Sequence, residues 1–344
     1  MDVRISKALA CAAVVGMFAW AGQTHAADLV VGLFGGSFLD ASRECQIKAF
    51  EKKTGARVRT KLGSSAQFAA AVRATGGKSD FDVVYLDNSL ATQLRNEKLL
   101  EPIDRARLAN AKSVAPSAFD GESPYYVSFM TGSTVIVYDT TQVKTPPKSW
   151  NDLADPAYEG KLAIGDISGT AGSQFLLALN RMRGGTLDNL DPGFAAIAPL
   201  ARASALLYTQ ADQIVSLFER KEIAVAVWYS DRAGSAIDSG LPLAVVYPEE
   251  GAVGILPSVA IPKGSKQTEL ATQYIDALLS KEVQTCFAEK KYAGPVNTEV
   301  RLSEKASRIV AVGKHFDELW LPDPAAVARG MPAWVGRWQR EVAR

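Results

Sequence analysis

The sequence predicts an α/β protein built from two lobes. Residues 28–86 alternate strand and helix patterns in the order β-α-β-α-β, which indicates a parallel sheet covered on both faces. A second set of strand and helix patterns begins near residue 134. The chain has 344 residues, of which 47% are hydrophobic, so it is long enough for two hydrophobic cores of ordinary size.

The first set of elements follows directly from hydrophobic patterning and turn residues. Its expected strands are residues 28–33, 58–62 and 81–86. The helix after the first strand is expected to be capped by Asp40 and to end at Gly55, where a left-handed residue is needed. A capping-box pattern from Ser64 to Gln67 begins the next helix.

The second set of elements also alternates strand and helix patterns. Its expected strands are residues 134–138, 161–165 and 223–228, with one helix near Gly172 and another that places Ile214, Leu217 and Phe218 on one face. Residues 259–262 and the helix after them return to the pattern of the first set. The C-terminal segment is expected to be helical, with Trp334 and Trp338 on one face.

The first 26 residues have the features of a secretory signal peptide. Two basic residues precede an apolar run over residues 8–21, and residues 24–26 form a small-x-small cleavage pattern. We expect cleavage before Ala27, which predicts a periplasmic protein. A membrane anchor, which needs about 20 consecutive apolar residues, and a lipoprotein attached through Cys11 are the alternatives.

Cleavage at this position would leave 36 basic and 36 acidic residues and a formal charge of zero. A balanced chain of this kind gives no reason to expect nucleic acid or an anionic membrane surface as a partner. No later segment is long and apolar enough to be read as a membrane span.

Two cysteines remain after cleavage, Cys45 and Cys286. In an oxidising compartment, an even pair of cysteines makes a disulfide an open possibility. Two buried free thiols are the alternative, because a free cysteine is often a core residue.

Several short motifs occur in an order that resembles a known family. They are residues 49–55 (AFEKKTG), 80–84 (DFDVV), 99–104 (LLEPID), 148–161 (KSWNDLADPAYEGK), 247–251 (YPEEG), 260–264 (AIPKG) and 292–297 (YAGPVN). Together they cover essentially the whole mature chain, which is similar to the periplasmic solute-binding proteins of ABC importers, in the subgroup of the spermidine/putrescine receptors.

The resemblance implies the two-lobed, type II periplasmic-binding fold, in which each lobe is a doubly covered, mainly parallel sheet and the ligand cleft lies between the lobes. The expected parts are a signal peptide (1–26), lobe 1 (27–130 plus 255–298) and lobe 2 (131–254 plus 299–344). It also implies hinge closure on a small molecule, docking on membrane permease subunits, a monomer and no cofactor. The expected solute is a polyamine or a related amine, amino acid or anion.

Ligand-binding residues are expected where strands of an open α/β sheet end. The loop residues Gly36, Ser37 and Phe38 follow the first strand, and Asp87 and Asn88 follow the third. The family resemblance adds a further set of expected ligand-binding residues: Ser133, Asp166, Trp228 with Tyr229 and Asp231 after it, Ile255 and Tyr292. For Trp228 and Tyr292 the alternative is plain core packing.

Two segments point away from a pure polyamine ligand. Ile255 stands where the polyamine receptors have Trp, and Pro257 stands where they have an amine-binding Asp. The run from Thr170 to Ser173 offers hydroxyl groups and free backbone N–H groups at a helix start, which suit a carboxylate, phosphonate or phosphate. The alternative for this run is an ordinary helix cap without a ligand.

Three competing functions need consideration. Tyr125 and Tyr126 resemble the tyrosine pair of ferric-ion receptors, but they lie in an expected strand. A single mature histidine, His315, leaves few ligands for a transition metal, so no metal site is expected. An enzyme on the same fold is the main alternative class, although none of the familiar nucleophile, zinc or phosphate-loop motifs occurs and no catalytic residue is assigned. A structural or adhesive protein is the third.

Overall fold

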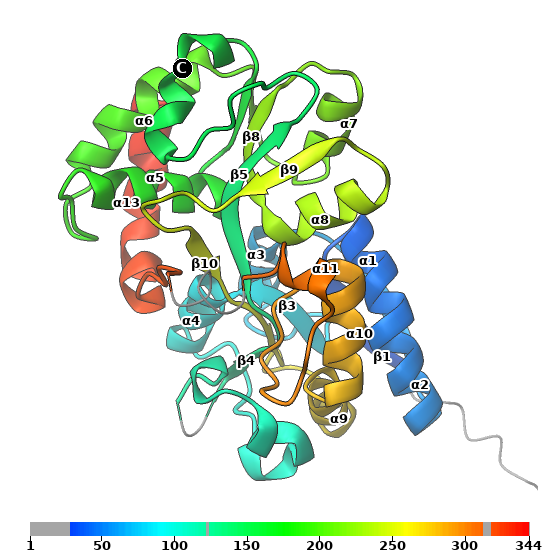
Figure 1. The fold of residues 1–344 in the computed structure, drawn as a ribbon. Helices are drawn as coiled ribbons and strands as arrows, with labels where there is room; N and C mark the ends of the chain where they lie inside the picture. The colour runs from blue at the N-terminus through cyan, green and yellow to red at the C-terminus, as the bar shows by residue number, and fades with distance from the viewer. Residues whose placement is uncertain (1–27, 122–123, 312–317, 344) are drawn as a thin grey trace, which may run out of the picture.

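The computed structural model describes residues 28–121, 124–311 and 318–343. It has two mixed sheets, one in each half of the molecule, with helices packed around both (Figure 1). The predicted two-lobed α/β fold is therefore confirmed, but both sheets are mixed and not mainly parallel, because strands that cross between the lobes pair antiparallel to their neighbours. The predicted leader and His315 lie outside the described residues.

The sheet of lobe 1 has five strands in the order β2-β1-β3-β11-β4. Their bounds are β1 Asp28–Leu33, β2 Arg57–Leu62, β3 Val83–Asp87, β4 Tyr126–Ser128 and β11 Pro257–Ala260. The strand β1 is parallel to β2 and β3, as the β-α-β-α-β pattern predicts, whereas β11 is antiparallel to both β3 and β4. The sheet is mixed because β11 enters it from the other lobe.

The helices of lobe 1 cover both faces of this sheet. They are α1 Ser37–Ala41, η1 Ser42–Ile47, α2 Lys48–Thr54, α3 Ser65–Ala74, α4 Asn88–Asn96, α9 Thr268–Leu278 and α10 Lys281–Lys291, with short 3-10 turns at Arg105–Arg107, Ala109–Ser113 and Pro116–Ala118. The capping box between Ser64 and Gln67 and the left-handed Gly55 are confirmed. The predicted Asp40 cap is wrong, because the helix already begins after Gly36 and Asp40 lies within its first turn.

The sheet of lobe 2 follows the order β10-β5-β8-β6-β7, with β9 also paired to β5. Its strands are β5 Gly132–Asp139, β6 Leu162–Gly165, β7 Leu206–Tyr208, β8 Val225–Tyr229, β9 Leu243–Val246 and β10 Val253–Ile255. Its helices are η5 Trp150–Ala154, η6 Pro156–Tyr158, α5 Thr170–Met182, α6 Asp191–Ala203, α7 Gln213–Glu219, α8 Ser230–Asp238, α11 Glu304–Ser307 and α13 Pro324–Glu341. Here β6 is parallel to β7 and β8, and β5 is antiparallel to its neighbours.

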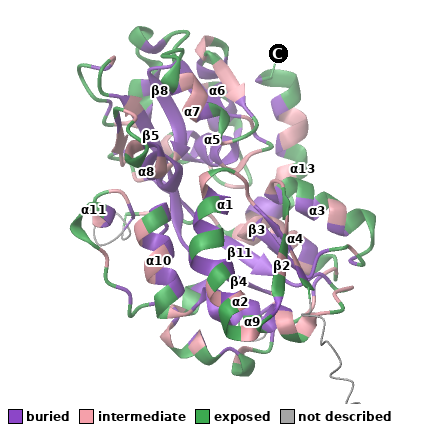
Figure 2. Ribbon diagram, turned by 90° about the vertical axis from the view of Figure 1, so that its right-hand side faces the viewer, coloured by how far each residue is buried: buried purple, intermediate pink, exposed green. Residues whose placement is uncertain are grey.

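Each sheet is buried on both faces, as Figure 2 shows for the strands at the centre of both lobes. Alternate residues of one strand belong to different cores: Val83 and Tyr85 lie in one cluster, and Val84 and Leu86 in another. The same alternation separates the two cores of lobe 2. This two-sided burial explains why the strands are almost continuously apolar.

Three segments join the lobes. The chain passes from β4 into β5 around Thr131, returns from β10 into β11 around Leu256, and leaves α10 through Gly294. Thr131 and Gly294 each donate a backbone N–H to the other's carbonyl oxygen, both at 2.7 Å. The C-terminal helix α13 also contacts both α4 and α6. The lobe boundaries predicted at residues 130, 254 and 298 stay a prediction.

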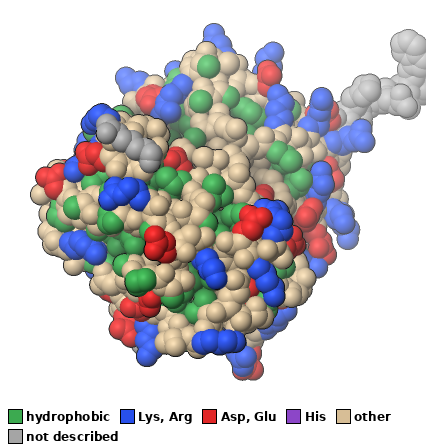
Figure 3. Space-filling model, turned by 90° about the horizontal axis from the view of Figure 1, so that it is seen from above, with side chains coloured by type: hydrophobic (Ala, Val, Ile, Leu, Met, Phe, Trp, Pro, Cys, Tyr) green, Lys and Arg blue, Asp and Glu red, His purple; other side chains and the backbone are tan. Residues whose placement is uncertain are grey.

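No helix within the described ranges has the length and apolar character that crossing a membrane requires. Basic and acidic side chains are interspersed on the face of lobe 2 that Figure 3 shows from above.

A disulfide joins Cys45 in η1 to Cys286 in α10, with a Cα–Cα distance of 5.6 Å. Of the two alternatives that the sequence leaves open for these cysteines, the structure has the bridge. It ties the helix after β1 to a helix that lies 241 residues later in the chain.

Removing this bridge should lower the free energy of unfolding by about 2–4 kcal/mol, because the bridge restricts the unfolded chain. Denaturant titration with and without reductant measures the change. The Cys45→Ser/Cys286→Ser variant is the control and should not respond to reductant. Two titratable thiols in the unreduced, unfolded protein would contradict the assignment.

Candidate functional site

The loops at the carboxyl ends of the central strands meet where the two lobes touch. In lobe 1 these are the ends of β1 and β3, and in lobe 2 the ends of β6 and β8. The hydroxyl of Thr170, at the start of α5, donates a hydrogen bond to the carboxylate of Asp87, at the end of β3. The lobes are therefore in direct contact at the position where an open α/β sheet binds its ligand.

Asp87 is half-buried, and its carboxylate pairs with no cation among the residues that the structure describes. Burial raises its pKa, and hydrogen bonds with the hydroxyls of Thr170 and Ser65 partly offset this effect. Its own backbone N–H donates to Ser65 Oγ at 3.1 Å. Among the ion pairs within the described residues, none includes Asp87. A cation placed here would favour the charged carboxylate and remove the cost of its burial.

Beside Asp87, the aromatic residue Tyr229 links the two loops of lobe 2. Its hydroxyl accepts a hydrogen bond from the backbone N–H of Ala171 at 3.0 Å. Burial raises the pKa of Tyr229, and the nearby carboxylate of Asp87 raises it further. Tyr229 therefore stays neutral and can present its hydroxyl and ring to a bound molecule.

Arg232, in the first turn of α8, crosses the interface toward β1. Its Nη1 lies 2.8 Å from Asp212 Oδ1 and donates to the carbonyl oxygen of Gly35 at 3.1 Å. Asp212 lies directly over Gly36, where an added Cβ atom would be 2.5 Å from Asp212 Oδ2. Gly36 has a φ of 61°, so both its backbone conformation and this close approach favour glycine.

A buried ion pair crosses the interface at the preceding residue of α8, Asp231. Lys291 Nζ, at the end of α10, lies 2.7 Å from Asp231 Oδ2, and the Lys291 side chain is 0% exposed. Burial lowers the pKa of Lys291 to about 8, although the charge of Asp231 opposes this shift. Lys291 is therefore mainly protonated at neutral pH and needs its partner.

The structure brings half of the predicted ligand-binding residues to this interface. They are Gly36, Ser37, Asp87, Asn88, Thr170, Tyr229 and Asp231. Asn88 begins α4 and is half-buried, and its side chain makes no hydrogen bond to any residue that the structure describes. Ser37 Oγ lies 3.5 Å from Arg232 Nη1. A contact between any of these residues and a ligand stays a prediction.

Three predicted aromatic residues are buried by neighbouring protein groups, and two of them, Phe38 and Tyr292, contact α8 of lobe 2. Phe38 packs against Phe129 and Phe287. Trp228 is fully buried on the face of β8 opposite to Tyr229, and its indole N–H donates to the carbonyl oxygen of Ala211. The ring of Tyr292 packs on Gly234, with its hydroxyl bonded to Asp238 at 2.6 Å. Trp228 and Tyr292 pack within the protein, and a contact of either residue with a ligand stays a prediction.

Three other predicted residues are also engaged or buried within the protein. Asp166 accepts a hydrogen bond from the indole N–H of Trp338 at 2.9 Å and thus holds α13. Ser133 is bonded to Ser230 at 2.9 Å, and Ile255 is buried in β10.

The small residues at the start of α5 are explained by packing. An added Cβ atom at Gly172 would lie 2.2 Å from the carbonyl oxygen of Asp166, so only glycine fits against β6. Ser173 Oγ donates to the carbonyl oxygen of Thr170 at 3.0 Å. The anion that lies at this helix start in the structure is the carboxylate of Asp87. A ligand anion at Thr170–Ser173 stays a prediction.

The tyrosine pair noted in the sequence also has a structural role. The hydroxyl of Tyr126 lies 2.8 Å from Thr92 Oγ1 in the interior of lobe 1. Its position supports the structural interpretation of the pair.

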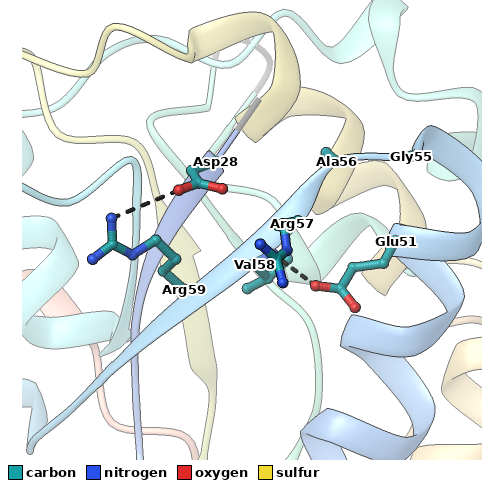
Figure 4. Close-up of a pocket in the computed structure, with 7 residues that line it drawn as sticks. All are labelled: Asp28, Glu51, Gly55, Ala56, Arg57, Val58 and Arg59. Atoms are coloured by element: carbon teal, nitrogen blue, oxygen red, sulfur yellow. Dashed lines mark hydrogen bonds and ion pairs between the residues drawn. The ribbon is translucent and has the colours of Figure 1, made fainter. Parts of the chain in front are cut away.

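Two cavities lie away from the interface. The first, of about 690 Å³, is at the amino end of β1 and is lined by Asp28, Glu51, Gly55, Ala56, Arg57, Val58 and Arg59 (Figure 4). Three of its four charged groups are engaged within the protein: Asp28 pairs with Arg59 at 3.6 Å, and Glu51 accepts from the backbone N–H of Val58 at 2.8 Å. The second, of about 670 Å³, lies between η5, η6, α5 and α6 on lobe 2.

Sequence reasoning missed Arg232, Asp212, Lys291 and Ser65. Arg232 and Lys291 are direct neighbours of the predicted residues Asp231 and Tyr292, so their proximity was a usable signal. Asp212 gives no such signal, because it lies in a loop that only the fold brings to Gly36.

Comparison with known proteins gives a consistent result. The family model described as "Bacterial extracellular solute-binding protein" matches residues 46–313. The spermidine/putrescine-binding periplasmic protein of Escherichia coli K12 is 27% identical over 307 residues, covering 86% of this chain and 83% of that protein. The gamma-aminobutyric acid-binding protein of Pseudomonas aeruginosa is 25% identical over 291 residues, covering 81% and 80%.

A solved structure of an ABC transporter protein from Clostridium perfringens is also similar. It is 27% identical, has a TM-score of 0.73, and the match covers 91% of this chain and 99% of that one.

Replacing Lys291 with Met should lower the free energy of unfolding by roughly 3–5 kcal/mol, because it leaves Asp231 buried without a counter-ion. Lys290→Met is the matched control: Lys290 is exposed and pairs with Glu44 on the surface, so its loss should have little effect. Denaturant unfolding of both variants provides the comparison. Equal stabilities of the two variants would show that the buried pair has no such role.

Proposed function

The chain belongs to the family of bacterial extracellular solute-binding proteins, and we propose that it is the receptor of an ABC importer that captures a small organic amine. The state of the Asp87 carboxylate is the observation that supports an amine as the ligand. This carboxylate lies at the lobe interface, its pKa is raised by burial, and no cation pairs with it in the described part of the chain. An ammonium group is the ligand chemistry that supplies the missing charge and N–H donors.

The relatives support the same chemistry. Spermidine, putrescine and gamma-aminobutyric acid all carry a primary ammonium group at neutral pH, although they differ at the other end. An ammonium is thus the common feature of the solutes for which these relatives are named. Asp87 offers one carboxylate to such a group, and Tyr229 is close to it. Asn88 follows Asp87 in the chain, and its side chain makes no hydrogen bond to a described residue.

Binding would act by closing the lobes. Asp87 and Asn88 belong to lobe 1, whereas Thr170 and Tyr229 belong to lobe 2. A solute that contacts both groups binds the closed arrangement better than the open one, and it therefore shifts the population toward closure.

The remaining parts of the proposal follow from the family and the sequence. The protein would be exported through a cleaved signal peptide, act in the periplasm as a monomer, and deliver its solute to membrane permease subunits. It would bind its solute stoichiometrically without turnover. The lobes would be residues 27–130 plus 255–298 and residues 131–254 plus 299–344.

Asp87→Asn should weaken amine binding by roughly 10- to 100-fold, because the neutral amide removes the charge that pairs with the ammonium. Thermal shift and calorimetry with putrescine, spermidine, 4-aminobutanoate and 2-aminoethylphosphonate measure the effect. Butanoate and ethylphosphonate serve as amine-free probes that should not bind.

The matched control is Asp188→Asn, which makes the same chemical change at an exposed loop position. This variant should bind like the unmodified protein. Equal binding of the amine-free probes, or full affinity of Asp87→Asn for amines, would refute the proposed amine recognition. Turnover of a bound solute would favour an enzyme.

A further inference from the structure

The charges at the lobe interface leave room for only one ammonium group. Among the described residues around Tyr229 and the first turn of α8, the carboxylates are those of Asp87, Asp212 and Asp231, and the cations are those of Arg232 and Lys291. Asp238, farther along α8, is already bonded to Tyr292 and paired with Lys305. Asp212 pairs with Arg232 at 2.8 Å and Asp231 pairs with Lys291 at 2.7 Å. Asp87 is the carboxylate that remains without a cation in the described part of the protein. A second ammonium on the same solute would find no free carboxylate at the interface.

Arg232 has N–H groups that the described part of the protein does not use. Its side chain is only 9% exposed. Its hydrogen bonds to described residues all come from Nη1, which reaches Asp212, the carbonyl oxygen of Gly35 and Ser37 Oγ. Its guanidinium also lies over the ring of Phe38, with Cζ 5.9 Å from the ring centroid. Nε and Nη2 donate to no acceptor in the described ranges. Because a guanidinium carries five N–H donors and stays protonated in proteins, its unused N–H groups call for an acceptor.

Arg232 and Asp87 act on the same small region. Arg232 lies three residues after Tyr229 in the first turn of α8, and the charges of Asp87, Arg232 and Asp231 all act on the Tyr229 hydroxyl. Of these, Asp231 is compensated by Lys291. A solute seated beside Tyr229 would therefore experience a negative charge from lobe 1 and a positive charge from lobe 2. The negative charge of Asp87 would attract the ammonium end of the solute, and the positive charge of Arg232 would attract an anionic end.

We propose that Arg232 is a specificity-determining residue, which makes the site select a solute with one ammonium and an anionic group at its other end, and reject diamines. This inference rests on the proposed function, because it takes Asp87 as the ammonium partner. A carboxylate or phosphonate end receives the unused N–H groups of Arg232. A second ammonium in that place meets a like charge, which is strongly unfavourable in a buried site.

Paired probes that differ only at one end test this selection. They are 3-aminopropanoate with 1,3-diaminopropane, 4-aminobutanoate with putrescine, and 5-aminopentanoate with cadaverine. For the pair whose chain length matches the distance between Asp87 and Arg232, calorimetry should give at least tenfold tighter binding of the amino acid than of the diamine. Three lengths are used so that spacing does not decide the result.

Arg232→Gln should invert the preference toward the diamine, because it removes the repelling charge and leaves Asp212 as a second free carboxylate. Arg232→Gln/Asp212→Asn removes both charges and should bring the affinity ratio close to one. It also keeps the charge balance, so it remains informative if the single variant is unstable. Arg220→Gln, at an exposed arginine paired with Glu222 in the same lobe, should keep the ratio of the unmodified protein.

Diamine binding as tight as that of the amino acids, or an unchanged ratio in Arg232→Gln, would overturn the role of Arg232 while leaving amine capture intact. If no amine of any kind binds, the proposed function itself fails, and this inference fails with it.

Discussion

The closed arrangement depends on the pairing of charges that the two lobes bury against each other. Removing a charged group from water costs several kcal/mol unless a partner compensates for it. The first turn of α8 satisfies this requirement across the interface through Asp231, which pairs with Lys291 of α10, and within lobe 2 through Arg232, which pairs with the half-exposed Asp212 and donates to the carbonyl oxygen of Gly35 in lobe 1. Asp87 is the exception. The proposed amine completes the pairing, so closure and binding are one event.

The connections between the lobes allow such an event without unfolding either lobe. Two strand crossings and the segment after α10 lie side by side, held by the reciprocal backbone bonds of Thr131 and Gly294. Gln174 ties α5 to this region, since its amide donates to the carbonyl oxygen of Gly254 at 2.8 Å and its oxygen accepts from Thr134 at 2.7 Å. Each lobe keeps its own cores on both sides of its sheet. The lobes can therefore move as bodies about this narrow connection.

The sequence predicts the fold well, because periodicity and turn residues act locally. Gly55 ends its helix as expected, since no other residue adopts the left-handed conformation as easily. The site is harder to predict, because a strand alternates its faces: Tyr229 reaches the interface, and its neighbour Trp228 is buried in the core. The contact of Arg232 with Gly35 spans 197 residues and depends on how the lobes meet, which no local pattern encodes.

Small-angle scattering of the mature protein with and without a bound amine tests closure most directly. The account predicts an expanded, open form without solute, and a smaller radius of gyration with saturating amine, at which the scattering curve agrees with the closed arrangement described above. An identical scattering curve with and without a solute that demonstrably binds would contradict it.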